Sequence, residues 1–247
     1  MKKVVLVTGA SRGIGAATAK HLSEAGYTVI INYRHNADKA EQLAAQLTQD
    51  GATAMAIQAD VSQENEVVQL FEQIDKIGPI TALVNNVGIL QKQMPLVQMS
   101  AQRINHILTT NVTSCFLCCR EALKRMSTDF GGKGGAIVNV SSAASRIGGP
   151  GEYIDYAASK GAVDTLTTGL SVEVAAQGVR VNCVRPGFIY TDMHADGGEP
   201  NRVDRLTPLI PMKRGGTPHE VATAIAWLLS EEASYVTGSF IDLAGGK

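Results

Sequence analysis

The sequence predicts an α/β fold, in which a doubly wound, mostly parallel sheet of seven strands carries helices on both faces. Short runs rich in β-branched residues alternate along the chain with longer segments whose apolar residues recur at helical spacing. No repeat and no Pro- or Ser-rich linker interrupts this alternation. Strands that alternate with helices are typical of a parallel sheet covered on both sides. Residues 1–247 are therefore expected to form a single domain.

The first half of the chain supplies four strands and three helices. "KKVVLV" and "TVIIN" are continuous apolar runs, which indicate strands buried on both faces. Each of the three helical segments ends at a glycine, a residue that commonly terminates helices. Ser62, with Asn65 and Glu66 in the turn that follows, is a candidate cap for the third helix. We expect strands at 2–7, 28–32, 53–60 and 81–86, and helices at 13–27, 37–51 and 62–78.

The second half continues the pattern with longer helices. Residues 100–126 and 153–176 are both long enough, and apolar enough on one face, to form helices of several turns. Pro186 ends the strand "VRVNCVRP", because proline cannot donate to the hydrogen-bond ladder of a sheet. An irregular segment, 187–217, follows it. We expect the remaining strands at 136–140, 179–186 and 239–245, and a last helix at 218–230.

The composition excludes several classes of function. The net charge is −1 and no run of Lys and Arg exceeds two residues, whereas nucleic-acid-binding domains usually carry a basic stripe. No apolar stretch approaches the roughly 18 residues of a membrane-spanning helix. The apolar run after the N-terminal lysines is too short for a secretory signal. We therefore expect a small-molecule substrate as the partner, with no nucleic acid and no membrane.

The cysteines indicate neither a disulfide framework nor a metal site. Cys115, Cys118, Cys119 and Cys183 have no second ligand pair at zinc spacing, and the five histidines provide none. We expect them to be small buried side chains on a helix or strand. Free thiols are typical of the reducing cytosol, so a cytoplasmic location is expected.

A glycine-rich turn follows the first strand and predicts a dinucleotide site in a Rossmann-type fold. "TGASRGIG" places Gly9, Gly13 and Gly15 between a buried strand and a helix. Glycine lets backbone N–H groups approach a pyrophosphate, and the helix N-terminus adds partial positive charge. Ser11 can bond an oxygen of the same ligand. In parallel sheets ligands lie at the carboxyl ends of the strands, where this turn falls.

The residues after the second strand favour NADP(H) as the cofactor, with NAD(H) left open. Tyr33 and Arg34 stand where an NAD-binding chain often places a carboxylate for the adenosine ribose. A carboxylate would repel a ribose phosphate, whereas arginine can pair with it. Arg12, in the glycine turn, is close enough to assist. Asp60, after the third strand, is a candidate acceptor for the adenine amino group.

Two tyrosines three residues apart differ in their neighbours. Tyr156 has Lys160 at i+4, so both side chains project from one helix face, whereas Tyr153 has Ala157 at that spacing. A phenol, with a pKa of about 10, is a poor acid or base at neutral pH. A neighbouring ammonium favours the phenolate. Tyr156 is therefore the candidate acid or base, and Ser142 could bond the substrate oxygen.

These motifs carry a family resemblance. "TGASRGIG", "NNVG", Asn111, "VSS", "YAASK" and "RPG", in this order over essentially all 247 residues, resemble the short-chain dehydrogenase/reductase family. Within it, the chain looks most like the glucose 1-dehydrogenase-like bacterial oxidoreductases. The resemblance implies a homotetrameric NAD(P)-dependent enzyme that interconverts an alcohol and a carbonyl.

The resemblance also implies a role for each site residue. Tyr156 would donate the proton in reduction, Lys160 would bind the nicotinamide ribose and lower the pKa of the phenol, and Ser142 would orient the substrate oxygen. Asn111, a poor helix former within a helix, would hold a water that links Lys160 to solvent. Hydride would move to or from the nicotinamide. Cofactor contacts are implied for Gly9, Ser11, Arg12, Gly13, Ile14, Gly15, Tyr33, Arg34, Asp60, Val61, Asn86, Val87, Gly88, Tyr156, Lys160, Pro186, Gly187, Ile189 and Thr191.

Three departures from the family pattern bear on these roles. Val87 replaces the usual alanine beside the cofactor. Ser142 lies one residue farther from Tyr156 than in many members, so Ser141 remains an alternative catalytic serine. Val172 stands where the acyl-carrier-protein reductases of the family have an arginine.

The segment 187–217 is the expected substrate-binding loop, or lid, over Tyr156. It mixes charges and glycines with scattered apolar residues, which favours a small polar, hydroxylated substrate. Glu152 and Tyr153 are expected to line the same pocket. Two other functions remain open: a 3-oxoacyl-[acyl-carrier-protein] reductase, and a non-catalytic NADP(H) sensor, although sensors usually lose the tyrosine or the lysine.

Overall fold

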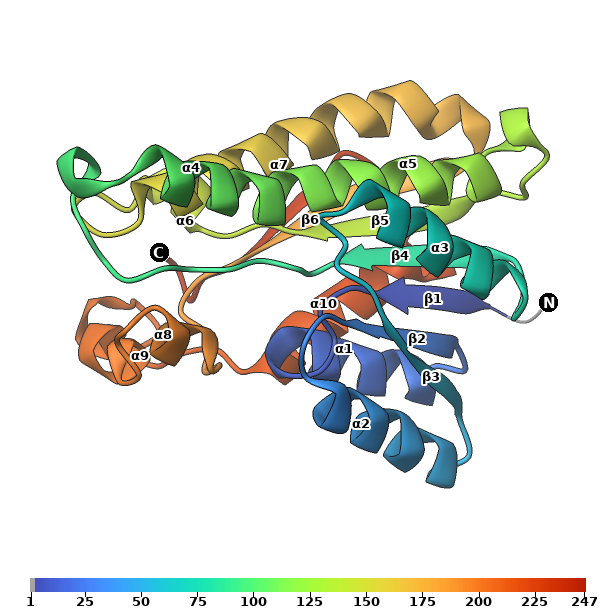
Figure 1. Ribbon diagram of the computed structural model, residues 1–247, viewed down its shortest axis with the longest axis horizontal. Coiled ribbons are helices and arrows are strands. Elements are labelled where there is room, and N and C mark those ends of the chain that lie inside the picture. The colour runs from blue at the N-terminus through green and yellow to red at the C-terminus, as the bar shows by residue number, and fades with distance from the viewer. Residues whose placement is uncertain (1–2) are drawn as a thin grey trace.

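A computed structural model describes residues 3–247. Figure 1 shows three layers, with one sheet between two layers of helices. Helices α3, α4, α5 and α7 lie over one face of the sheet, and α1, α2 and α10 lie over the other. The predicted fold class is confirmed: the chain has a Rossmann-like, doubly wound sheet with helices on both faces.

The seven strands form one sheet in the order β3-β2-β1-β4-β5-β6-β7, and every neighbouring pair is parallel. Strands β1 and β2 are buried along their whole length because helices cover both faces. The first expected strand began at residue 2, which lies outside the described residues. The strands are β1 (Val4–Val7), β2 (Thr28–Tyr33), β3 (Thr53–Gln58), β4 (Ile80–Asn85), β5 (Gly135–Val140), β6 (Val179–Pro186) and β7 (Phe240–Leu243).

Each layer of helices packs an apolar face on the sheet, and two cores result. Leu22 and Ile225 belong to the core under α1, α2 and α10, while Phe71 and Met126 belong to the core on the opposite face. The helices are α1 (Gly13–Glu24), α2 (Ala37–Gln49), α3 (Glu64–Asp75), α4 (Ala101–Leu108), α5 (Ser114–Met126), α6 (Ala144–Ile147), α7 (Ile154–Val174), α8 (Met193–Asp196), α9 (Arg202–Leu206) and α10 (Pro218–Leu229).

Two local expectations were wrong. Residues 100–126 do not form one helix, because a π-helical turn at Thr109–Thr113 separates α4 from α5. Ser62 does not cap α3, which begins at Glu64 and has no side-chain cap. Its hydroxyl instead donates to Asp60 Oδ1 at 2.7 Å, because the carboxylate two residues earlier is the nearer partner. The segment expected to be irregular, 187–217, contains the short helices α8 and α9.

The strand order opens a crevice at the carboxyl ends of β1 and β4. These strands are neighbours in the sheet although β2 and β3 lie between them in sequence, and such a reversal of order leaves space for a ligand. Thr8 joins the two strand ends, since its Oγ1 accepts hydrogen bonds from the backbone N–H groups of Asn86 and Val87 at 3.0 and 3.2 Å. None of the helices formed by residues 3–247 is both long and apolar enough to cross a bilayer.

Candidate active site

The glycine turn after β1 is shaped by close backbone contacts. Gly9 and Gly13 have φ values of +61° and +56°, which side chains other than glycine rarely adopt. A Cβ on Gly15 would lie 2.6 Å from Asn86 Nδ2 and 2.7 Å from the carbonyl oxygen of Gly9. Val87, which replaces an alanine of the family pattern, would lie 3.0 Å from a Cβ on Gly9. The turn therefore stays open to a ligand only with glycine at these positions.

Beside this turn lies a cavity of about 300 Å³, which we call the nucleotide cavity. Its walls come from the carboxyl ends of β1, β2, β3 and β4, as expected for a dinucleotide site. The implied cofactor residues that line it are Gly9, Ser11, Arg12, Gly13, Ile14, Tyr33, Arg34, Asp60, Val61, Asn86, Val87, Gly88 and Thr191. Gly15 lines no cavity and instead packs behind the turn.

The basic residues expected to contact a ribose phosphate are both paired with carboxylates. Arg34 Nε lies 3.0 Å from Asp60 Oδ2. Arg12 forms ion pairs with Asp196 and, at 3.7 Å, with Asp192. The Arg34 pair uses Nε, and the terminal N–H groups of the guanidinium have no ion-pair partner among residues 3–247. Arg12 connects the glycine turn to α8 of the 187–217 segment.

A second cavity of about 430 Å³, which we call the substrate cavity, adjoins the nucleotide cavity. Ile14, Asn86 and Gly88 line both of them. The implied site residues that line the substrate cavity alone are Ser142, Tyr156, Lys160, Pro186, Gly187 and Ile189. An elongated ligand could thus extend from the glycine turn to Tyr156.

Lys160 is a buried cation with hydrogen-bonding capacity to spare. Its side chain is 2% exposed, and its Nζ donates to the carbonyl oxygen of Val140 at 2.8 Å. None of the ion pairs among residues 3–247 includes it. An ammonium has three donors, so two remain for a ligand. A Cβ on Gly88 would lie 3.1 Å from Nζ, so glycine there leaves the ammonium room. These features fit the ribose of a nicotinamide cofactor.

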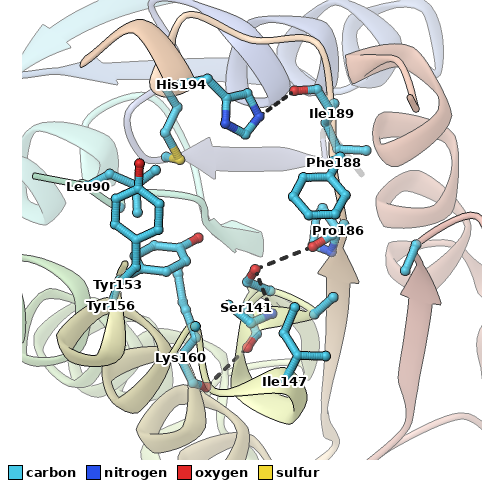
Figure 2. A pocket seen from close by; sticks show the side chains of 18 of the residues that line it. Leu90, Ser141, Ile147, Tyr153, Tyr156, Lys160, Pro186, Phe188, Ile189 and His194 are labelled. Atoms are coloured by element: carbon cyan, nitrogen blue, oxygen red, sulfur yellow. Dashed lines mark hydrogen bonds between the residues drawn. The ribbon is translucent and has the colours of Figure 1, made fainter. Parts of the chain in front are cut away.

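The two tyrosines of the 151–162 region occupy different places. Tyr156 and Lys160 lie on one face of α7, and Nζ is 5.7 Å from the centre of the Tyr156 ring. Figure 2 shows the Tyr156 hydroxyl directed into the cavity, with Tyr153 beside it as part of the wall. The Tyr153 hydroxyl donates to the carbonyl oxygen of Gly197 at 3.3 Å. Tyr153 and Glu152 line the cavity, as expected.

The two candidate serines are also distinguished by their contacts. Ser141 is 3% exposed, and its hydroxyl donates to the carbonyl oxygen of Lys160 at 3.1 Å. Ser142 is half-buried, and its Oγ lies 3.4 Å from the carbonyl oxygen of Pro186 at the cavity wall. Both serines line the cavity: the Ser141 hydroxyl bonds α7, whereas Ser142 Oγ donates to the carbonyl oxygen of Pro186 and accepts from the Ala144 N–H at 3.1 Å. Ser142 as the catalytic serine stays a prediction.

Asn111 lines neither cavity. Its Oδ1 accepts from the Ile89 N–H at 2.8 Å, and its Nδ2 donates to Ser159 Oγ at 3.0 Å. The π-helical turn places this buried amide between the loop after β4 and helix α7. Such single-turn π-helices are frequent at functional sites.

Comparisons with known proteins agree with this geometry. Residues 9–247 match the family described as Enoyl-(Acyl carrier protein) reductase, within the short-chain dehydrogenases/reductases. The chain belongs to the short-chain dehydrogenase/reductase family. It is accordingly an NAD(P)-dependent oxidoreductase of that family.

Relatives of this short-chain dehydrogenase/reductase match it end to end. The uncharacterized oxidoreductase YgfF of Escherichia coli (strain K12) is 65% identical over 245 residues, which cover 99% of each chain. The 3-oxoacyl-[acyl-carrier-protein] reductase FabG of Staphylococcus epidermidis is 36% identical and covers 100% of this chain and 99% of its own. The crystal structure of a dehydrogenase/reductase from Sinorhizobium meliloti 1021 superimposes with a TM-score of 0.91 at 30% identity, covering 99% and 94% of the two chains.

Sequence reasoning assigned the 187–217 segment, Glu152 and Tyr153 to this pocket but did not single out the other side chains of its wall. The side chains come from segments far apart in sequence, and no motif marks them. The additional wall residues include Leu90, Ile147, Phe188, Met193, His194, Arg202, Leu206 and Lys247. Most of these are apolar, whereas the charges of 187–217 pair mainly with one another or with Arg12, Glu152 and Glu220. These charges have partners within the chain, and the polar, hydroxylated substrate stays a prediction from composition.

Proposed function

We propose that this protein is an NADP(H)-dependent oxidoreductase that interconverts a secondary alcohol and a carbonyl compound. The observation that carries the proposal is the substrate cavity, where Tyr156 and the buried ammonium of Lys160 adjoin the nucleotide cavity. When bound, the nicotinamide cofactor supplies the hydride in reduction and accepts it in oxidation.

The residues of the chain handle the proton and the orientation of the substrate. Tyr156 gives its phenolic proton to the carbonyl oxygen in reduction and takes it back in oxidation. Lys160 stabilises the phenolate by its charge and holds the ribose through its two remaining donors. Ser142 donates a hydrogen bond to the same substrate oxygen. Asn111 fixes the loop after β4 against α7 and, as the family resemblance implies, holds a water that relays protons from Lys160.

The first test is Tyr156→Phe. Removing the acid should lower kcat by about 10²–10⁴-fold, the usual contribution of a general acid. Tyr235→Phe is the matched control, because Tyr235 is fully exposed and lines neither cavity. Turnover of a working ketone with NADPH is followed by absorbance. If Tyr156→Phe retained activity within a few-fold, the proposed mechanism would be wrong.

The cofactor preference is tested through Arg34. A charge-assisted hydrogen bond to a phosphate contributes about 1.5–3 kcal/mol, so Arg34→Ala should lower the NADPH/NADH ratio of kcat/KM by roughly 10- to 100-fold. Arg214→Ala is the control, because its exposed pair with Glu220 lies outside both cavities. An unchanged ratio in Arg34→Ala would remove the role that we assign to this residue.

The relatives favour a second candidate, a 3-oxoacyl-[acyl-carrier-protein] reductase. Proteins of that name from Staphylococcus and Synechocystis are 36–38% identical over the whole chain. Against this candidate, Val172 is 78% exposed on α7, where the carrier-protein reductases have an arginine. An exposed valine offers no charge to an acidic carrier protein. Faster turnover of acetoacetyl-carrier protein than of its small thioester analogue would favour this candidate.

Two further expectations belong to the proposal. Tight NADPH binding without turnover on a broad panel of carbonyl compounds and alcohols would instead favour a non-catalytic sensor.

A cytoplasmic location is supported by Cys115, Cys118, Cys119 and Cys183, which are buried free thiols.

A further inference from the structure

The wall of the substrate cavity contains several polar side chains, but nearly all of them are already paired. Arg202 is 8% exposed, and its guanidinium donates to Glu152 at 2.5 Å and to Glu199 at 3.1 Å. The Tyr153 hydroxyl donates to the carbonyl oxygen of Gly197. Arg202 is thus held by carboxylates through two of its five N–H groups, and the Tyr153 proton is already donated within the chain.

Charge is balanced where the wall is ionic. Arg202 and Arg205 face Glu152 and Glu199, so two cations meet two anions. The pKa of Glu199 is lowered to about 2, chiefly by its hydrogen bond from Arg205. Glu199 therefore stays ionised at ordinary pH, and the formal charges of the four side chains sum to zero. A charged substrate group next to this ion-pair cluster would displace a pair and leave an unpartnered charge.

His194 contributes at most one acceptor. Its Nε2 lies 3.1 Å from the carbonyl oxygen of Ile189, which can only accept, so Nε2 carries the proton. Its Nδ1 is buried and has no partner among the described residues. Burial lowers the pKa of His194, which keeps the ring neutral. Figure 2 shows this ring at the end of the cavity opposite Lys160.

The remaining wall is apolar and aromatic. Figure 2 shows Tyr153 and Leu90 on one side of the cavity, and Phe188, Pro186 and Ile147 on the other. The Arg202 guanidinium lies 4.9 Å from the centre of the Tyr153 ring and 5.7 Å from that of Phe188, so it closes the space between the two rings. Lys247 Nζ lies 5.2 Å from the Phe188 ring, and Lys247 lines the cavity together with Lys160 and Arg202.

We propose that the site takes neutral carbonyl compounds, or the corresponding alcohols, that are polar only at the reacting end and otherwise apolar, with aryl alkyl ketones as the representative class. This inference rests on the proposed function and specifies its substrate. Tyr156, Ser142 and Lys160 present polar groups at the end of the cavity where the carbonyl reacts. Outside the ion pairs, His194 Nδ1 and the Lys247 ammonium are polar groups elsewhere on the wall. Tyr153 and Phe188 flank the apolar body, and the neutral ion-pair cluster closes the far end.

Matched pairs of ketones test the substrate class. Methyl para-acetylbenzoate and para-acetylbenzoate share the reacting ketone and differ in charge, and butanone and dihydroxyacetone differ in hydroxylation. We expect kcat/KM with NADPH to be at least tenfold higher for the neutral, apolar member of each pair. Preference for the carboxylate or for dihydroxyacetone would overturn the inference while leaving the proposed oxidoreductase function intact.

A binding measurement separates failure of the inference from failure of the function. If none of the four ketones were reduced, the proposed function would be contradicted. Calorimetric titration of the NADPH-loaded protein would then still compare the dissociation constant of the ester with that of the carboxylate. Tighter binding of the ester by tenfold or more supports the inference, and equal or weaker binding overturns it.

Variants of the ion-pair cluster give a reciprocal test. Arg202→Met leaves Glu152 with only Arg205, at 4.0 Å, and gives the cluster a net negative charge. Turnover of a para-trimethylammonium acetophenone should therefore rise at least tenfold relative to the ester. Glu152→Gln removes one anionic partner of Arg202, so turnover of para-acetylbenzoate should rise relative to the ester. This variant tests the cluster if Arg202→Met does not fold. Arg214→Met should change neither ratio. If neither variant shifted its ratio, the neutral cluster would not determine the substrate class. The same would follow if the protein preferred the carboxylate and Lys247→Gln lost that preference.

Discussion

At the level of single residues, Tyr156 differs from Tyr153 because Lys160, one helical turn on, places its ammonium 5.7 Å from the Tyr156 ring centre. A lysine at i+4 is a property of helical spacing, which is visible in the sequence. The two candidate serines, Ser141 and Ser142, follow a strand end, where the direction of each side chain depends on how the chain turns. In the folded chain the two hydroxyls have different partners, since Ser141 bonds α7 and Ser142 bonds the carbonyl oxygen of Pro186.

His194 makes the stability of the protein depend on pH. Burial lowers its pKa in the folded state, so the unfolded chain takes up a proton more readily as the pH falls. This contribution to stability is complete above the ordinary histidine pKa and is lost as the pH falls from that value toward the lowered one. Between about pH 7.5 and about pH 5.5, the free energy of unfolding should therefore fall less in His194→Gln than in the wild type.

Urea denaturation at both pH values measures this difference, and His35→Gln, at an exposed site, is the control. Equal losses in His194→Gln and the wild type would contradict this account.

At the level of elements, periodicity predicted every strand and the principal helices but not the π-helical turn at Thr109–Thr113. One extra residue within a helix hardly disturbs the apolar spacing on either side. The turn is visible only through its consequence, which is that Asn111 bridges Ile89 and Ser159. The same limit applies to α8 and α9, which are too short to show a period.

A buried ion pair joins α4 to the first turn of α7. Arg103 Nε donates to Asp155 Oδ2 at 2.7 Å, and Asp155 Oδ1 accepts from the Tyr156 N–H at 2.9 Å. Both charged side chains are almost fully buried. Arg103→Met leaves the carboxylate unpaired and should lower the free energy of unfolding by about 3–5 kcal/mol.

The double variant Arg103→Met/Asp155→Asn should recover much of that loss, because it removes the unpaired charge. Arg214→Met breaks an exposed pair instead and should cost less than about 1 kcal/mol. Urea denaturation measures all three variants. A loss in Arg103→Met no larger than that in Arg214→Met would show that the buried pair does not anchor α7.

At the level of the whole molecule, alternation of strands and helices was enough to predict one parallel sheet, but only the 187–217 segment, Glu152 and Tyr153 of the substrate cavity were predicted. Its wall combines the loop after β4, helix α6 and the segment 187–217, which meet only in the folded chain. The charges of that segment suggested a polar ligand. In the folded protein they neutralise one another, and composition alone cannot reveal such pairing.

The exposed face of the α4, α5 and α7 layer leads to a prediction about assembly. Phe116 on α5 is 52% exposed and Val172 on α7 is 78% exposed, although helices of a monomer usually present polar residues to solvent. The family resemblance implies a homotetramer, and we expect subunits to pack through this face. Phe116→Glu should therefore shift the protein from tetramer toward dimer, as measured by size-exclusion chromatography with light scattering.

Met55→Glu, on the edge strand β3, introduces the same charge at an exposed apolar site away from this layer and should leave the mass unchanged. A monomeric wild type, or a Phe116→Glu variant of unchanged mass, would mean that this layer of helices faces solvent.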